Sequence, residues 1–166
     1  VSYGTSRVEF IGQRDALFPW YTGERGLAVL RPERPQVTGD DREVANVLGI
    51  GGAIQLRPAN MSGGERQRVA LWTVMCREPE LVIMDEPFTA LDDECLLRCL
   101  DVFSAWLTVN KVGLFIVSHD AIVLKRLCDD VYVVAGGAGC MPVEGGLASV
   151  THNSNERPGA KQGVPG

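Results

Sequence analysis

The sequence has few lysines, no paired-cysteine motif and no long apolar run, and each absence narrows what the chain can be. Lysine occurs only three times and the net charge is −5, so the chain has no basic face of the kind that dominates nucleic-acid binding. The five cysteines form no C-x-x-C pair, which favours reduced, structural thiols over a zinc site. No apolar run approaches the roughly 20 residues of a membrane span. We therefore expect a soluble protein that does not bind DNA or RNA.

The second half of the chain alternates apolar runs with helical patterns. Continuous apolar runs are typical of strands buried in parallel sheets. The predicted strands are residues 80–84, 112–117 and 131–134, and the predicted helices are residues 64–77, 92–108 and 121–128. The alternation predicts an α/β fold, with a mostly parallel sheet flanked by helices.

The segment before Ser62 is expected to be smaller and mainly helical. Short helices are predicted at residues 24–30 and 41–48, and Asp40 or Asp41 would cap the second of them. Gly49 would end that helix. A short β-prone run lies at residues 7–12, a small hairpin is possible at 136–150, and the polar, glycine- and proline-rich tail 151–166 is expected to be disordered. The predicted organisation is therefore one domain over residues 1–150, with a helical subdomain at about 21–77, a core at 78–150 and the tail.

Ser62-Gly63-Gly64-Glu65 stands immediately before a predicted helix. S-x-x-E is a capping box, in which Ser62 and Glu65 each satisfy a backbone amide that the helix leaves open. The same four residues also suit a phosphate, because Gly63 and Gly64 leave backbone N–H groups uncovered at the positive end of a helix. The sequence of this turn by itself leaves both interpretations open.

Asp85 and Glu86 follow an apolar strand, and His119 follows the next one. Polar strand ends are often only solvated, and Ser118 or Asp120 could simply cap the next helix. However, the carboxyl ends of parallel strands meet at the edge where open α/β folds bind ligands. There one carboxylate can hold Mg²⁺ through water, and the other can orient or deprotonate an attacking water molecule.

Five motifs in this order resemble the nucleotide-binding domain of ABC ATPases. They are Gln13, then M-S-G-G-E-R-Q-R from Met61, L-V-I-M-D-E-P from Leu81, T-A-L-D-D from Thr89 and V-S-H-D from Val117. The resemblance covers about residues 7–150 and implies the P-loop NTPase type of fold. Residues 13–20, QRDALFPW, are most similar to importer ATPases of the nitrate, sulfonate and taurine type.

The resemblance implies a role for each matching residue. Ser62, Gly63, Gly64 and Glu65 form the signature motif, which would bind the γ-phosphate of ATP held by a second subunit, and Asp92 would cross the interface of that head-to-tail dimer. Asp85 and Gln13 would hold Mg²⁺, Glu86 would act as the catalytic base, His119 would be the switch histidine, and Gln13 would also couple the site to the membrane subunit. Phe18-Pro19-Trp20 would lie near the surface that receives the permease. The chain would work at the inner face of the cell membrane, on the cytoplasmic side.

The phosphate loop of this family, G-x-x-x-x-G-K-[ST], does not occur in the sequence, and no lysine follows a glycine. In the family, its strand lies between those expected here at residues 112–117 and 131–134. We therefore expect an ATP-hydrolysing subunit of an ABC importer, present as a fragment that is inactive alone. The alternative is a non-catalytic interaction module that lends its signature helix to the ATP site of a partner.

Overall fold

A computed structural model describes residues 7–12, 17–135 and 139–142 of the chain. The chain divides into two compact units, Val1–Asp129 and Asp130–Gly166. In the second unit, β4 (Tyr132–Ala135) and β5 (Gly139–Pro142) form an antiparallel pair. A hairpin therefore forms near the predicted place but starts earlier. The proposed tail, 151–166, lies outside the described residues, and a single domain over 1–150 stays a prediction.

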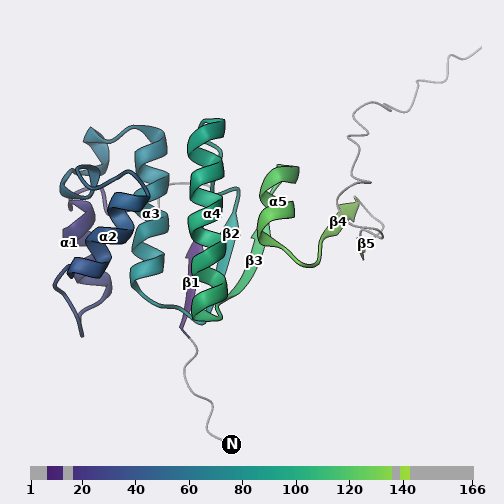
Figure 1. Ribbon diagram of the computed structural model, residues 1–166, viewed down its shortest axis with the longest axis horizontal. Coiled ribbons are helices and arrows are strands. Elements are labelled where there is room, and N and C mark those ends of the chain that lie inside the picture. Colours follow the sequence, from purple (N-terminus) through teal and green to yellow (C-terminus); the bar gives the residue numbers. More distant parts are fainter. Residues whose placement is uncertain (1–6, 13–16, 136–138, 143–166) are drawn as a thin grey trace, which may run out of the picture. The chain divides into compact units, whose positions relative to one another are not determined.

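The first unit contains three strands and five α-helices among its described residues (Figure 1). They are β1 (Val8–Ile11), α1 (Gly23–Leu30), α2 (Gly39–Val47), α3 (Gly63–Cys76), β2 (Leu81–Asp85), α4 (Asp93–Asn110), β3 (Gly113–Val117) and α5 (Ala121–Leu127). Each lies within a few residues of its predicted position. Among the described residues, no helix combines the length and the apolar character that crossing a bilayer requires.

The three strands form a parallel sheet in the order β1-β2-β3. Ile11 pairs with Met84, and Asp85 pairs with Val117, so the carboxyl ends of neighbouring strands lie at the same edge. Among the described residues β3 is an edge strand, because β4 pairs with β5 instead. The α/β fold with a parallel sheet is confirmed.

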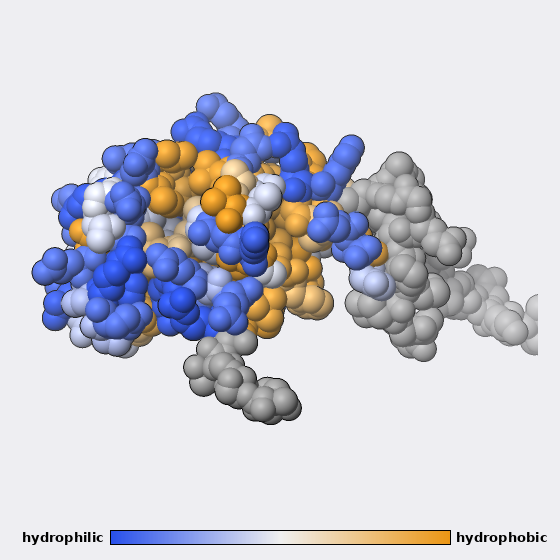
Figure 2. Space-filling view, turned by 60° about the horizontal axis from the view of Figure 1, so that its bottom comes forward, coloured by the Kyte–Doolittle hydropathy of each residue, from blue (hydrophilic) through white to orange (hydrophobic). Residues whose placement is uncertain are grey.

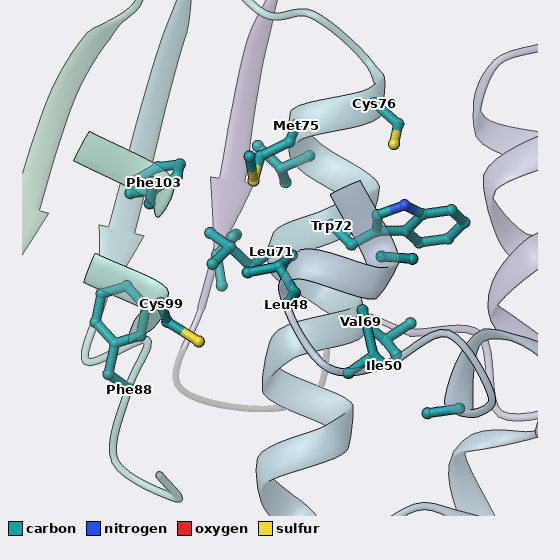
Figure 3. Packing of buried hydrophobic residues seen from close by; sticks show 14 of the residues in the cluster. Leu48, Ile50, Val69, Leu71, Trp72, Met75, Cys76, Phe88, Cys99 and Phe103 are labelled. Carbon is teal, nitrogen blue, oxygen red and sulfur yellow. The ribbon is translucent and has the colours of Figure 1, made fainter. Parts of the chain in front are cut away.

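One face of this sheet is covered by helices. Val82 and Met84 of β2 and Ile11 of β1 point into the core and are at most 5% exposed. In Figure 1, α4 crosses in front of β1 and β2, and α3 stands between the sheet and the pair α1–α2. Figure 3 shows Leu71, Met75, Phe88 and Phe103 meeting in this core.

The opposite face of the sheet is exposed, which corrects the prediction of fully buried strands. In-register residues on this face include Phe10 and Phe115, each 62% exposed, with Val8 at 49% and Val117 at 51%. A parallel sheet normally has both faces covered, and its apolar residues on both faces reflect that. Apolar surface is visible in Figure 2. The runs of apolar residues thus correctly predict strands, but the described residues cover only one side of them.

Helix α3 is buried along its second half. Leu71 to Cys76 are all buried, with Trp72 fully so, and Trp72 packs beside Val69 and Cys76 in Figure 3. The Trp72 indole Nε1 donates to the Asp41 carbonyl at 2.7 Å. A helix that is apolar around its circumference belongs inside a protein. This helix therefore joins the helical segment to the sheet.

The caps of α2 differ from the prediction. Thr38 is the N-cap, and its hydroxyl accepts from the Asp41 amide at 3.3 Å. Asp41 returns the bond, because its Oδ2 accepts from the Thr38 amide at 2.8 Å. Asp40 is not the cap because the helix begins after Thr38, which places Asp40 within its first turn, where it is exposed. Gly49, with φ of 69°, follows the end of the helix as predicted.

Candidate functional site

The carboxylate pair lies where β2 ends. Asp85 is the last residue of β2, and Glu86 turns the chain with φ of 49°, in the left-handed region. For a residue other than glycine this conformation costs about 1–3 kcal/mol and is concentrated at functional sites. The Glu86 amide donates to the Val117 carbonyl at 2.9 Å, so this turn is tied to the end of β3. The backbone therefore brings Glu86 next to the residues that follow β3.

The Glu86 carboxylate contacts His119, as expected for neighbouring strand ends. Its Oε1 accepts from the His119 amide at 2.9 Å and lies 2.8 Å from the ring Nδ1. The His119 side chain is 74% exposed, whereas that of Glu86 is only 15% exposed. The hydrogen bond to Glu86, and then its negative charge, raise the pKa of His119. A carboxylate that faces an exposed imidazole is an arrangement suited to moving a proton.

The neighbouring polar residues cap α5, as one interpretation of this turn predicts; the catalytic interpretation stays a prediction. Asp120 is the N-cap, and its Oδ1 accepts from the Ile122 amide at 2.7 Å. The Ser118 hydroxyl accepts from the Asp120 amide at 3.1 Å and lies 3.5 Å from the Glu86 carboxylate. The helix cap thus holds the loop that presents His119.

Asp85 stands half-buried beside this pair at the sheet edge. The described residues contain no group of three or more His, Cys, Asp or Glu side chains that could enclose a metal ion. A single carboxylate fits Mg²⁺, because this ion usually keeps several waters and takes its other ligands from substrate phosphates. The carboxylate of Asp85 therefore suits a Mg²⁺ ion that is also bound by phosphates and water, rather than a metal ion enclosed by protein side chains.

The signature turn begins α3 with the predicted capping box. The Ser62 hydroxyl accepts from the Glu65 amide at 3.2 Å, and the Ser62 amide donates to Glu65 Oε2 at 2.7 Å. Hydrogen bonding of the Glu65 carboxylate to the Ser62 amide, and then to the Ser62 side chain, lowers the pKa of Glu65. The Gly63 and Gly64 amides stand in the first turn, where a helix provides no acceptor. The turn is therefore capped and still keeps two N–H groups for an anion.

The three residues after Glu65, which are Arg66, Gln67 and Arg68, each form hydrogen bonds to other parts of the protein. Arg66 Nη1 donates to the Met61 carbonyl at 2.9 Å, and Arg68 Nη1 to the Leu48 carbonyl at 3.1 Å. The Gln67 side chain binds Thr89 and Ala90, in the loop after β2. The sequence contains no direct signal for this contact, because the partners are more than twenty residues apart.

Asp92 ends the same loop and caps α4. Its Oδ1 accepts from the Cys95 amide at 2.9 Å, and the residue is exposed. Its predicted position at a subunit interface stays a prediction. Gln13 lies outside the described residues. The structure thus brings together Asp85, Glu86 and His119, and it places Asp92 at the end of the loop that packs on the signature turn.

A third feature is an aromatic cluster before α1. Phe18, Trp20 and Tyr21 have ring centroids 5.9–6.3 Å apart. Trp20 is 61% exposed, and Phe18 and Tyr21 line a small apolar hollow together with Pro58. The cluster therefore presents apolar surface to solvent beside a concave site.

Comparisons with known proteins agree with these motifs. Residues 3–89 match the family model described as ABC transporter. The chain is 33% identical to the thiamine import ATP-binding protein of Ruegeria sp. (strain TM1040), over 81% of this chain and 60% of that protein. It is 32% identical to the molybdenum import ATP-binding protein of Brucella abortus (strain 2308), over 79% and 37%. It is 36% identical to the aliphatic sulfonates import ATP-binding protein of Bacillus subtilis (strain 168), over 67% and 44%.

Solved structures show the same fold. A dimeric bacterial ABC transporter cassette superposes with a TM-score of 0.66 at 20% identity, over 76% of this chain and 58% of that one. Another dimeric cassette, in a post-hydrolysis state with ADP and Pi, gives a TM-score of 0.63 at 21% identity, over 73% and 56%. The chain spans between 37% and 60% of the length of the three curated relatives. Since the family model matches more than half of its residues, the chain belongs to the ABC transporter family of ATP-binding proteins.

Proposed function

We propose that the chain forms part of an ATP-hydrolysing subunit of an ABC importer, the part that contains the signature motif and the carboxylates Asp85 and Glu86. The observation that carries this proposal is the contact between Glu86 and His119 beside Asp85, at the carboxyl edge of the sheet. In this proposal Asp85 and Gln13 would hold Mg²⁺, and the ion would neutralise charge on the phosphates. Glu86 takes a proton from the attacking water, and His119 steadies the γ-phosphate and that water.

We further propose that ATP lies between two subunits arranged head to tail. Ser62 is exposed, and the Gly63 and Gly64 amides at the start of α3 can face a phosphate held by another subunit. Asp92 is exposed on the loop that packs on this turn, where it can cross to the same partner. The likeness to dimeric cassettes supports this arrangement.

The phosphate loop that this site needs is not among the 166 residues. We therefore propose that a polypeptide segment outside these 166 residues supplies it. Two features support this proposal: the exposed apolar face around Phe10 and Phe115, and the edge of β3, which no strand of the described residues pairs. A strand beside β3 would pair its free backbone groups, and a helix over the exposed face would cover the apolar residues. The loop that connects this strand to this helix would be the phosphate loop, and it would lie near Asp85 and Glu86.

A membrane permease is the proposed second partner, which would hold the chain at the cytoplasmic face. The exposed ring of Trp20, beside the small apolar hollow lined by Phe18 and Tyr21, gives such a partner an apolar contact on this surface. The import ATP-binding proteins among the relatives support this direction of transport.

The test is ATP hydrolysis by the chain completed with the phosphate-loop segment of a related importer ATPase. We expect the completed protein to release phosphate, and Glu86→Gln to lower kcat by at least about 100-fold, because the base is lost. Glu43→Gln, which changes an exposed glutamate of α2, is the matched control and should leave kcat unchanged. Full activity of Glu86→Gln would contradict the assignment.

The same assay separates the alternative function. If the chain is an interaction module, Ser62→Ala should weaken ATP hydrolysis at the site of a partner. Glu86→Gln should then leave ATP hydrolysis unchanged. The exposed, capped signature turn is the feature that both functions share.

A further inference from the structure

Gln67 joins the signature helix to the loop after β2 through both ends of its amide. Its Nε2 donates to the Thr89 hydroxyl at 3.1 Å, and its Oε1 accepts from the Ala90 amide at 2.9 Å. A backbone N–H can only donate, so the orientation of the Gln67 amide follows from its partners. Gln67 lies on the second turn of α3, just past the capping box.

The same two segments also pack directly. A Cβ placed on Gly63 would lie 3.3 Å from the Cβ of Ala90, and one on Gly64 would lie 3.2 Å from the Ala90 carbonyl oxygen. The signature glycines thus permit a close approach of the loop, in addition to leaving amides open. The loop continues into Asp92, whose side chain caps α4.

The other end of the loop is held by the sheet. The Glu86 amide binds the Val117 carbonyl, and Phe88 is only 8% exposed. Thr89 and Ala90, in contrast, are exposed. Between the buried Phe88 and the cap at Asp92, the contact with Gln67 is therefore the polar interaction that fixes the loop against α3.

We propose that Gln67 is a positioning residue that makes Ser62 and Asp92 move as one unit toward the ATP of a partner subunit. This inference rests on the proposed function, in which both residues reach across the dimer. Loss of the Gln67 contact would leave Ser62 and the glycine amides in place on α3, but would free the loop that carries Asp92. Binding of nucleotide would then persist while the geometry for hydrolysis is lost.

The first test is amide hydrogen exchange, by NMR, on the 166-residue chain without nucleotide. Gln67→Met keeps the length of the side chain but removes both hydrogen bonds, and we expect the Ala90 amide to exchange about tenfold faster. The buried Met84 amide should exchange at the wild-type rate. Gln67→Glu should restore the protection of Ala90, because a carboxylate accepts from the Ala90 N–H and from the Thr89 O–H. Gln55→Met, at an exposed position, is the matched control.

An unchanged exchange rate of Ala90 in Gln67→Met would overturn the proposal, as would an equal acceleration at Met84, which would indicate general loss of stability. The second test is the completed hydrolysis assay. We expect Gln67→Met to lower kcat about tenfold with KM for ATP unchanged, and Gln67→Glu to behave as wild type. An unchanged kcat would refute the coupling. If the wild type itself fails to hydrolyse ATP, the proposed function is wrong, and the exchange experiment still decides whether Gln67 holds the loop.

Discussion

Arg31 and Asp41 form an ion pair in which both side chains are only 5% exposed. Arg31 Nη2 donates to Asp41 Oδ2 at 2.9 Å, and Nη1 donates to the Cys76 carbonyl at 2.8 Å. Asp41 also completes the capping box of α2. Despite the burial of this carboxyl, the Arg31 guanidinium and the hydrogen bonds from Thr38 hold its pKa well below the usual value of 3.8. The pair therefore connects α1, α2 and the end of α3.

Removal of this charge should destabilise the fold in a pH-dependent way. We expect Asp41→Asn to lower the free energy of unfolding at pH 7 by about 3 kcal/mol, because Arg31 would be left buried without its partner. The pKa of Asp41 is lower in the folded state than in the unfolded state. The wild type is therefore more stable than Asp41→Asn by the full amount well above pH 3.8, and this difference in unfolding free energy is lost as the pH falls. The difference should shrink by roughly 1.4 kcal/mol for each pH unit below about 4.

Urea denaturation between pH 2.5 and 7 measures this difference. Asp40→Asn, at the exposed neighbouring position, should change stability by less than about 0.5 kcal/mol at every pH. A difference between Asp41→Asn and wild type that does not depend on pH would show that the ionised carboxylate contributes nothing.

At the scale of elements, a glycine at the start of α1 allows this helix to approach the segment before α3 closely. A Cβ on Gly23 would lie 3.0 Å from the Ile54 carbonyl oxygen and 3.0 Å from Val69 Cγ1. Backbone cannot shift as a side-chain end can, so this close approach needs glycine. Thr22 caps α1 just before it, with its hydroxyl 3.3 Å from the Arg25 amide.

We therefore predict opposite effects for two glycine-to-alanine changes at helix starts. Gly23→Ala should lower the unfolding free energy by about 1–3 kcal/mol, because the added methyl group overpacks the contact with Ile54. Gly39→Ala, where a Cβ meets nothing within 4 Å, should leave stability unchanged or raise it by up to about 1 kcal/mol. Chemical denaturation checks both. Equal effects at the two positions would refute the packing explanation.

At the scale of the whole molecule, the exposed sheet face sets the behaviour of the chain. Four exposed apolar residues lie on β1 and β3, the strands on either side of β2: Val8, Phe10, Phe115 and Val117. Surfaces of this kind mark sites of association or cause aggregation. The proposed completion of the fold would cover this face.

We predict that the chain binds an apolar fluorescent dye through this face. The double change Phe10→Ser with Phe115→Ser should lower the dye fluorescence by about half, because it removes the two largest apolar side chains of this sheet face. Val109→Ser, at a 78% exposed position at the end of α4, should have little effect. Equal dye binding by the double variant and wild type would place the apolar site elsewhere.

The predictable part of the site is the part encoded over short distances. The capping box of Ser62 and Glu65 spans four residues, and the strand before Asp85 is a short apolar run, so each follows from local pattern. The proximity of Glu86 and His119 also follows, because parallel strands end at one edge. The cap of α2 differs from the prediction because Thr38, Asp40 and Asp41 are all acceptable N-caps by residue type, whereas in the structure the helix begins after Thr38 and Asp41 completes its capping box.

The sequence by itself thus determined the family, the alternation of strands and helices, and the edge at which the carboxylates and the histidine gather. Only the tertiary structure decided that Gln67 binds Thr89 and Ala90, that Arg31 and Asp41 are buried together, and which sheet face stays exposed. The physical reason is range. Helical hydrogen bonds, helix caps and apolar periodicity act between near neighbours in the chain. These contacts, in contrast, join segments ten to forty-five residues apart and exist only once the helices have packed on the sheet.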